Sequence, residues 1–175
     1  MMKIGVILGS IRKGRAGESV AKWVMDNAAG REGYEYTLLD LAEFRVPLLE
    51  AETVPGAANK QYADEATTAW SAAVDACDGF IFVTPEYNHS VPGPMKNAFD
   101  SLGGEWAGKP VAFVGYGADG AVRAVEHWRQ IVANFSMFGV RNQVALSLFD
   151  DFPTPRSQKN KDLTTVLGDI EQALA

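Results

Sequence analysis

The stretch GFIFVTPEYNHSVPGPMKNAFDSL, from Gly79 to Leu102, decides the fold of this chain. Its first residues, Gly79–Thr84, are almost purely apolar, as in a strand that is buried on both faces of a parallel sheet. After a polar loop, apolar residues recur at the spacing of one helix face: Met95, Ala98, Phe99 and Leu102. A buried strand that leads through a loop into a helix is the repeating unit of an α/β fold.

The same alternation continues on both sides of this stretch. Further strands are expected at Lys3–Gly9, Tyr34–Asp40, Pro110–Gly115 and Gln143–Phe149. Helical stripes separate them, within residues 20–28, 62–77, 125–135 and 163–170. We therefore expect one α/β domain over residues 1–175, a doubly wound five-stranded parallel sheet in a three-layer α/β/α arrangement.

The composition excludes several classes of protein. The formal net charge of -6 argues against a nucleic-acid partner, which needs a basic face. Cys77 is the single cysteine, so neither an intrachain disulfide nor a cysteine metal cluster can form, and we expect this thiol to be buried. No apolar run approaches the ~20 residues of a membrane span, and the N-terminal run is too short for a signal sequence. We expect a cytoplasmic protein without a membrane partner.

The loop after the first strand, residues Gly9–Ser19, is basic and leads into a helix. A helix N-terminus offers free backbone N–H groups and a partial positive charge, so it suits an anion. Ser10 can donate its hydroxyl, and Arg12 can hold a phosphate through two parallel hydrogen bonds. Because Lys13 and Arg15 add positive charge, we expect a phosphate group to bind here.

Two glycine patterns look like nucleotide-binding motifs but do not complete them. The first loop has P-loop glycine spacing, yet Arg15 and Ala16 stand where lysine and Ser/Thr would serve the terminal phosphates and magnesium, which excludes a nucleoside triphosphatase. The segment GYGADG, Gly115–Gly120, matches G-x-G-x-x-G but follows the fourth strand instead of the first. We expect its glycines to let the backbone approach a flat ligand, with Tyr116 as a wall.

The loop after the third strand is rigid and carries aromatic and polar groups. Its three prolines fix φ and lower the entropy lost on binding. Glu86, Tyr87 and Asn88 present backbone amides and an aromatic face where the strand order is expected to reverse. This combination suits a planar heterocycle with polar edges. A flat ring at this loop and a single phosphate at the first loop together describe FMN.

At this point the chain resembles the NAD(P)H-dependent FMN reductase family, whose fold is flavodoxin-like. The likeness rests on GSIR after the first strand, PEYNHSVPGPMKNAFD after the third and GYG after the fourth, and it spans Lys3 to about Asp150. The resemblance implies that the phosphate is held by Ser10, Arg12 and the backbone of Gly17, Glu18 and Ser19. It implies that the isoalloxazine is bordered by Pro85, Glu86, Tyr87 and Asn88 and covered at its edge by Tyr116 and Gly117.

The first loop departs from the family pattern. Many members read G-S-x-R-x-x-S-x-N, whereas this chain has Arg15 and Gly17 at the last two marked positions. Arg15 then either replaces the missing contacts to the FMN phosphate or meets the phosphates of the nicotinamide donor. The second alternative predicts a preference for NADPH over NADH, because a spare guanidinium suits a 2′-phosphate.

The resemblance implies an NAD(P)H-dependent, FMN-containing oxidoreductase that reduces a quinone, free flavin, azo compound or oxidised metal ion by two-electron transfer. Since the flavin carries the chemistry, no catalytic side chain is expected. The sequence has no G-x-S-x-G elbow and no histidine cluster with metal-ligand spacing. His127 is interpreted as a surface residue, and His89 as a candidate to tune the flavin or donate a proton. The alternatives are a flavodoxin-type electron carrier and a non-catalytic flavin-binding regulatory module.

We also expect a homodimer, or a dimer of dimers. Trp106 and Trp128 flank the fourth strand and Tyr87 lies beside the site, and aromatic residues are enriched at interfaces. The family resemblance further implies subunits that complete each other's flavin pocket.

Overall fold

A computed structural model describes residues 1–155 and 157–175 of the chain. Five parallel strands form one sheet in the order β2-β1-β3-β4-β5. The strands are β1 (Met2–Leu8), β2 (Tyr34–Asp40), β3 (Gly79–Pro85), β4 (Pro110–Gly117) and β5 (Phe138–Ser147). The α-helices are α1 (Gly17–Ala28), α2 (Leu41–Phe44), α3 (Glu65–Asp75), α4 (Gly93–Asp100), α5 (Val122–Val132) and α6 (Ser157–Leu174). This strand order is that of flavodoxin-like doubly wound folds, so the expected fold class is confirmed.

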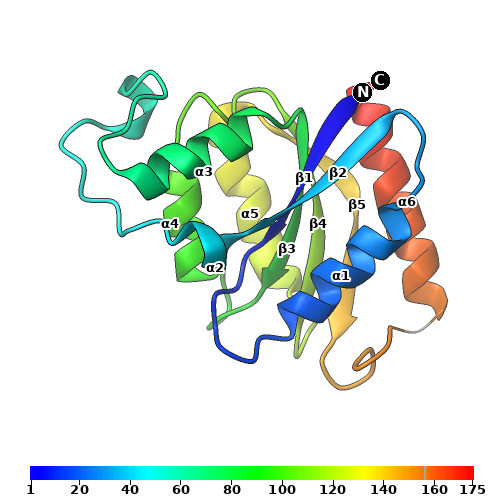
Figure 1. Cartoon of the computed structure of the whole chain (residues 1–175). Helices are drawn as coiled ribbons and strands as arrows, with labels where there is room; N and C mark the ends of the chain where they lie inside the picture. Colours follow the sequence, from blue (N-terminus) through cyan, green and yellow to red (C-terminus); the bar gives the residue numbers. More distant parts are fainter. Residues whose placement is uncertain (156) are drawn as a thin grey trace.

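The two faces of the sheet are covered by different helices, α1 and α6 on one face and α3, α4 and α5 on the other (Figure 1). The core under α1 and α6 is aliphatic apart from the ring of Tyr116, with Val24 of α1 and Leu167 of α6 fully buried. The core under α3, α4 and α5 is aromatic. Its buried rings belong to Trp70, Phe80, Phe82, Phe99, Trp106, Phe113 and Trp128.

The central strands are the ones that the sequence predicts best. Every residue of β3 and β4 is buried, which matches their continuous apolar runs. The last strand was expected at Gln143–Phe149, and this was wrong at both ends. β5 is an edge strand whose exposed and buried residues alternate irregularly, so its start carries no apolar run. It ends at Ser147, whose carbonyl accepts hydrogen bonds from Asp150 N (3.3 Å) and Asp151 N (2.9 Å) in a turn.

Two short elements after β2 were not predicted. α2 follows β2 directly, and the side chain of Asp40 caps it by accepting a hydrogen bond from Ala42 N at 2.9 Å. A single 3₁₀ turn, η1 (Pro55–Ala57), lies in the long segment before α3. A second 3₁₀ turn, η2 (Ala133–Phe135), extends α5. Elements of three or four residues are too short for a periodic pattern to reveal.

Trp106 and Trp128 were expected at a subunit interface, and the structure contradicts this. Their exposed fractions are 1% and 0%. The indole of Trp106 stacks on Phe99 with ring centroids 4.8 Å apart, and Trp128 meets Phe82 edge-on at 5.2 Å. Both rings are therefore core residues. Cys77 is buried as expected, and burial raises the pKa of its thiol.

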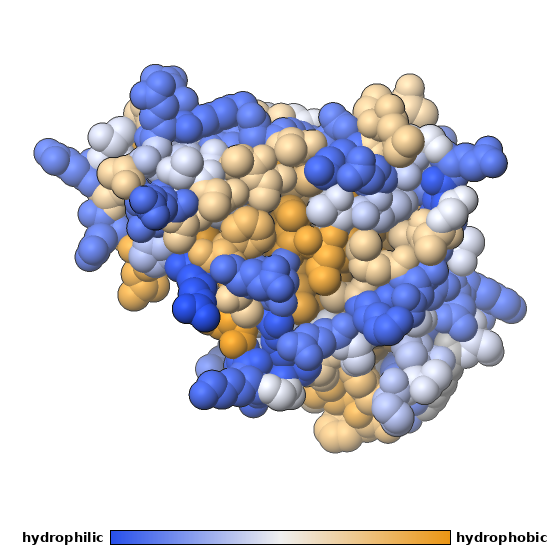
Figure 2. Space-filling view, viewed as in Figure 1, coloured by the Kyte–Doolittle hydropathy of each residue, from blue (hydrophilic) through white to orange (hydrophobic). Residues whose placement is uncertain are grey.

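The surface is mostly polar over the outer sides of the helices (Figure 2). On the face shown there, apolar atoms gather in the middle, where the edge strand β2 lies. Leu38 of β2 is 44% exposed. Among the described residues, no helix combines the length and apolar character needed to cross a bilayer.

Candidate functional site

The segments that follow β1, β3 and β4 lie together at the carboxyl end of the sheet, at the bottom of Figure 1. They are the β1 loop (Gly9–Ala16), the β3 loop (Glu86–Pro92) and the β4 loop (Ala118–Ala121). β1 lies between β2 and β3, so the strand order reverses at this point. Open α/β sheets bind ligands in the crevice at such a reversal.

The β1 loop leaves the sheet beside β3 and turns into an uncapped helix. Gly9 N donates to the carbonyl of Val83 at 3.0 Å, and a Cβ at Gly9 would collide with the sulfur of Met95. At the start of α1 no side chain caps the helix, and the hydroxyl of Ser19 turns back to the carbonyl of Ala16 at 2.8 Å. The first turn of α1 is therefore open to an anion.

Ser10 joins the β1 loop to the β3 loop. Its side chain is 1% exposed, and its Oγ lies 2.8 Å from the phenol oxygen of Tyr87. The two loops that were predicted to hold the two ends of FMN are thus in direct contact through these hydroxyls.

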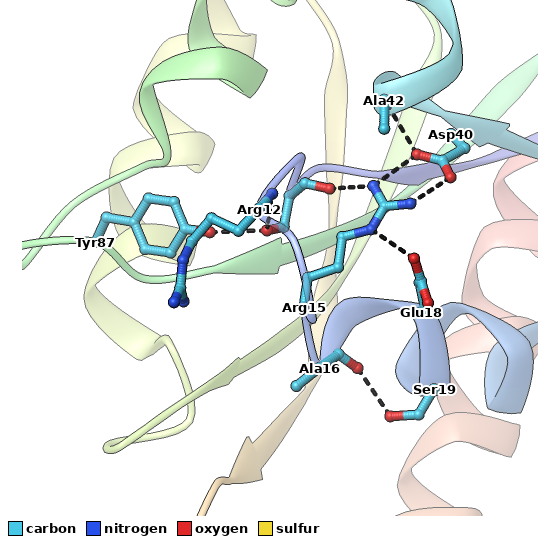
Figure 3. Close-up of polar contacts among 9 residues, drawn as sticks. Arg12, Arg15, Ala16, Glu18, Ser19, Asp40, Ala42 and Tyr87 are labelled. Carbon is cyan, nitrogen blue, oxygen red and sulfur yellow. Dashed lines mark hydrogen bonds and ion pairs between the residues drawn. The ribbon is translucent and has the colours of Figure 1, made fainter.

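Arg15 is occupied by protein groups, in contrast to the expectation that its guanidinium is spare (Figure 3). Its two terminal nitrogens donate to the two carboxylate oxygens of Asp40 at 2.8 and 2.6 Å, and its Nε donates to Glu18 at 3.1 Å. It also donates to the backbone carbonyl of Ser10. The hydrogen bond to Asp40 is the main cause that raises the pKa of Arg15. The free guanidinium on which the predicted NADPH preference rested is therefore not present in this structure, and the preference itself stays a prediction.

Arg12 and Lys13 are the cations of this loop that remain available. Both are exposed, and neither forms an ion pair with any residue in the described ranges. In Figure 3 the side chain of Arg12 extends away from Arg15, on the side where Tyr87 lies. The predicted phosphate-binding role of Arg12 stays a prediction, and the structure leaves its guanidinium free for it.

Tyr116 lies buried beneath the start of α1, and its role at the edge of the ring stays a prediction. A Cβ built on Gly17 would collide with the hydroxyl of Tyr116 and come within 2.7 Å of Leu8. Among the described residues, this buried hydroxyl has no hydrogen-bond partner. Burial is the main cause that raises the pKa of Tyr116, and the nearby Ser10 side chain and the charge of Arg15 act against it. Gly17 is required here because only a residue without a side chain lets the helix start on the tyrosine.

The β3 loop is a tight hairpin turn. Tyr87 and Ser90 exchange two backbone hydrogen bonds, of 3.1 and 3.2 Å, and the two residues between them have positive φ, 50° at Asn88 and 71° at His89. Two consecutive positive φ values define a type I′ turn. Asn88 and His89 are exposed at its tip, while Pro85 is buried at the end of β3.

Glu86 faces α5 and not the crevice. Its Oε2 accepts hydrogen bonds from the backbone N–H groups of Arg123 (3.2 Å) and Ala124 (3.3 Å), and its Oε1 pairs with the Arg123 guanidinium. Burial acts to raise the pKa of Glu86, but the hydrogen bonds from Arg123 and Ala124 outweigh it and hold that pKa below its usual range. The side chain that was predicted to border a ring is a helix cap, and its backbone remains the part that can face a ligand.

The glycines of GYGADG make room for the chain itself. A Cβ at Gly115 would lie 2.8 Å from the carbonyl of Gly120, and one at Gly120 would lie 2.8 Å from the Cβ of Ala145. The carbonyl of Gly117 accepts hydrogen bonds from Gly120 N (3.2 Å) and Leu148 N (3.0 Å). Gly117 lies beside Glu86, whose Cβ would be 3.7 Å from a Cβ at this position.

His127 was interpreted as a plain surface residue, and the structure corrects this. It is half-buried on α5, and its Nδ1 lies 2.7 Å from the hydroxyl of Ser90 in the β3 loop. Asp40 was also missed as a site neighbour; its signal is its place at the carboxyl end of a strand beside β1. Among the described residues, no group of His, Cys, Asp or Glu is arranged to hold a metal ion.

These residues fit a ligand with a phosphate at one end and a flat ring at the other. The open start of α1, the free cations Arg12 and Lys13, and the side-chain-free Gly17 suit the phosphate. The rigid turn of the β3 loop, with Tyr87 bonded to Ser10, suits a planar group next to it. FMN meets these requirements.

Comparison with known proteins agrees with this geometry. Residues 2–151 match the family model described as NADPH-dependent FMN reductase. The chain is 42% identical over 128 residues to the NAD(P)H-dependent FMN reductase ntnL of Nectria sp, covering 71% of this chain and 64% of that protein, slightly less than two thirds of its length. It is 33% identical over 138 residues to a quinone reductase of Escherichia coli K12, covering 75% of this chain and 69% of that protein.

A solved structure shows the same fold. FerB of Paracoccus denitrificans, described as a flavoenzyme NAD(P)H:(acceptor) oxidoreductase, superposes with a TM-score of 0.77 at 21% identity and covers 99% of both chains. The family match extends over nearly the whole chain and includes all three loops of the site. This chain therefore belongs to the NADPH-dependent FMN reductase family.

Proposed function

We propose that this protein is an NAD(P)H-dependent, FMN-containing oxidoreductase that reduces a small acceptor by two-electron transfer. The observation that carries the proposal is the pairing of an uncapped helix start and the unpaired Arg12 with a rigid turn, joined through Ser10 and Tyr87. Family membership and the similarity to a quinone reductase support the same reading.

The residues proposed to hold the cofactor divide into two groups. Ser10, Arg12 and the backbone from Gly17 to Ser19 would bind the phosphate. The backbone from Pro85 to Asn88, the Tyr87 side chain and Gly117 would border the ring. When bound, FMN supplies the chemistry of taking a hydride from NAD(P)H and delivering two electrons to the acceptor.

The protein's own part in the reaction is binding and orientation. Tyr87 is fixed by Ser10, and Ser90 by His127, so the β3 loop is held at both ends of its turn. Quinones, free flavins, azo compounds and oxidised metal ions are the proposed acceptors, and quinones have the support of a named relative. An electron carrier of flavodoxin type has less support, because the β1 loop carries free cations where such carriers have hydroxyls.

The test is a visible spectrum followed by turnover. Purified protein reconstituted with FMN should show the flavin spectrum, lose it when NADPH is added without oxygen, and regain it when 1,4-benzoquinone follows. With both substrates in excess, NADPH oxidation should continue for many cycles. A flavin that binds but is not reduced by NADPH would support a carrier or a regulatory module instead. Protein that binds no FMN would overturn the proposal.

We also propose that the active form is a homodimer, or a dimer of dimers, located in the cytoplasm. The support is an apolar rim beside the site: Phe149 is 81% exposed, and Val122 and Leu148 are more than 40% exposed. A second copy that covers these side chains would bury them and shield the crevice. Light scattering that finds a fully active monomer at micromolar concentration would contradict the dimer, and fractionation of cells tests the location.

A further inference from the structure

We propose that Arg15 and Asp40 form a clasp that positions the β1 loop for the FMN phosphate, and that neither side chain is itself a ligand of the phosphate. The inference rests on the proposed function, and it assigns to both residues a positioning role. It replaces the expectation that Arg15 meets a phosphate of FMN or of NADPH.

The first argument is geometric. The guanidinium and the carboxylate meet in a two-pronged arrangement, Nη1–Oδ1 at 2.8 Å and Nη2–Oδ2 at 2.6 Å, which gives specificity as well as strength. Both side chains are largely buried, with 8% of Arg15 and 14% of Asp40 exposed. An arginine held this way cannot swing toward a ligand without leaving a buried carboxylate unpaired.

The second argument concerns what the clasp joins. Asp40 is the last residue of β2 and caps α2, so it is fixed from two sides. Arg15 reaches from the β1 loop to Asp40, to Glu18 in the first turn of α1, and to the backbone carbonyl of Ser10. Gly14, with φ of +64°, supplies the reversal that brings Arg15 back toward Ser10. One guanidinium therefore sets the path of the loop on both sides of Arg12.

The third argument concerns charge. Arg15 faces two carboxylates, those of Asp40 and Glu18, so its positive charge is already balanced within the protein. Arg12 and Lys13 have no such partners in the described part of the chain. The loop thus separates its basic residues into one that shapes it and two that remain available to an anion.

The two roles of Arg15 predict opposite signs for one substitution, Asp40→Asn. If Arg15 were a phosphate ligand, removing its competitor would release the guanidinium and strengthen FMN binding. If the pair is a clasp, losing the carboxylate loosens the loop and weakens FMN binding, by about tenfold, within the range of measured coupling between buried partners.

The experiment titrates apo-protein with FMN and with riboflavin for wild type, Asp40→Asn, Arg15→Gln and the double variant. We expect each single change to weaken FMN binding about tenfold, the double variant to be little weaker than either, and riboflavin to be affected less. At saturating FMN, kcat should return to the wild-type value, because the clasp touches no reacting atom. The matched control is Asp26→Asn, which breaks the exposed Lys22–Asp26 pair on α1 (2.6 Å) and should change neither affinity.

Arg15→Lys keeps the charge but loses the fork, so it should bind FMN as weakly as Arg15→Gln; it also carries the test if Asp40→Asn does not fold. Stronger FMN binding by Asp40→Asn, or unchanged binding by Arg15→Lys, overturns the clasp. Failure of the wild type to bind FMN in the same titration would instead overturn the proposed function, so the two failures are distinguishable.

Discussion

Helices α1 and α5 both begin at the site, but only the first turn of α5 is capped by a side chain. At α5 the carboxylate of Glu86 accepts hydrogen bonds from two backbone N–H groups, so the helix start is filled by the protein's own anion. At α1 no side chain caps the start, and Arg12 and Lys13 stand nearby without carboxylate partners in the described residues. Because a helix N-terminus attracts negative charge, the difference shows which of the two is available to a ligand.

An ion pair holds each of the two loops, but the loop supplies the arginine in one case and the acid in the other. In the β1 loop the arginine belongs to the loop and the acid, Asp40, to a neighbouring strand. In the β3 loop the acid, Glu86, belongs to the loop and Arg123 to the neighbouring helix. In PEYN the charged residue therefore holds the turn in place. The described cations of these two loops that have no ion-pair partner, Arg12 and Lys13, both belong to the β1 loop.

Of these variants, Arg12→Ala should have the largest effect, a loss of FMN affinity, because it removes positive charge beside the uncapped start of α1. A hydrogen bond to a charged group contributes about 1.5–3 kcal/mol, so FMN binding should weaken roughly 10- to 100-fold. Riboflavin, which lacks the phosphate, should lose less, and a magnesium chelator should have no effect. Titration of apo-protein with both flavins measures this.

Lys13→Ala is the matched control, since Lys13 is the neighbouring exposed cation. As a screened surface charge it should change FMN affinity by no more than about fivefold. Equal losses for FMN and riboflavin in Arg12→Ala would show that Arg12 does not contact the phosphate.

Gly17→Ala should disturb the start of α1 on the side where it packs on Tyr116. The new Cβ collides with the Tyr116 hydroxyl, and overpacking of this kind costs about 1–3 kcal/mol in stability. The double variant Gly17→Ala/Tyr116→Phe should recover part of the loss, because it removes the colliding oxygen. Thermal unfolding of the three variants beside wild type gives the answer.

The control for that series is Gly168→Ala. Gly168 lies inside α6, where a new Cβ would meet no described atom within 4 Å beyond its chain neighbours and the backbone of its own helix, so this change should stabilise the protein by up to about 1 kcal/mol. If Tyr116→Phe gives Gly17→Ala no relief, the tyrosine does not support the start of α1.

Glu86→Ala should have a smaller effect, confined to the filled helix. Loss of a helix cap costs about 1 kcal/mol, which for a chain of this size lowers Tm by about 2–4 °C. Asp119→Asn is the control, because Asp119 pairs with Arg123 at 2.8 Å but caps no backbone amide of α5. Equal Tm values for Glu86→Ala and wild type would mean that the cap contributes nothing.

The smallest expected effect is on how thermal stability depends on pH. The pKa of Glu86 is lower in the folded protein than in the unfolded chain, where a glutamate titrates near ~4.3. Its contribution to stability is therefore complete above that value and is lost as the pH falls through the folded-state pKa. Below about pH 4.3, the difference in Tm between wild type and Glu86→Gln should narrow. A difference that stays constant from pH 7 to 3 would show that Glu86 is not the titrating group.

The sequence predicts the fold well because the apolar or polar character of each residue indicates whether its position is buried. β3 and β4 are central, so every position is buried and nearly every residue is apolar, which makes the run easy to recognise. The edge strand β5 has no such constraint, and its bounds were wrong. Trp106 and Trp128 were assigned to an interface because an aromatic residue alone does not reveal whether it faces a partner or the core.

The partners in the site could not be predicted because they depend on strand register. Leu8 pairs with Asp40 across β1 and β2, and this places the carboxylate level with the start of the β1 loop, where Arg15 meets it. Nothing local to Arg15 or Asp40 indicates the pairing, since 25 residues separate them. The same holds for Ser90 and His127, which are joined only by the packing of α5 on the β3 loop.

Because the tryptophans are divided between the two sides of the sheet, their fluorescence should report on each side separately. Three of its four tryptophans lie in the aromatic core, where Trp70 and Trp106 are 6.1 Å apart and Trp128 meets Phe82, so their fluorescence should be that of shielded indoles that exchange excitation. Trp23 lies alone on the other side of the sheet, with its N–H bonded to Asn160 of α6 at 2.9 Å in a more exposed setting. Its emission should lie at longer wavelength. One spectrum therefore carries a separate signal from each side of the sheet, and Trp23→Phe would leave the signal of the aromatic side alone.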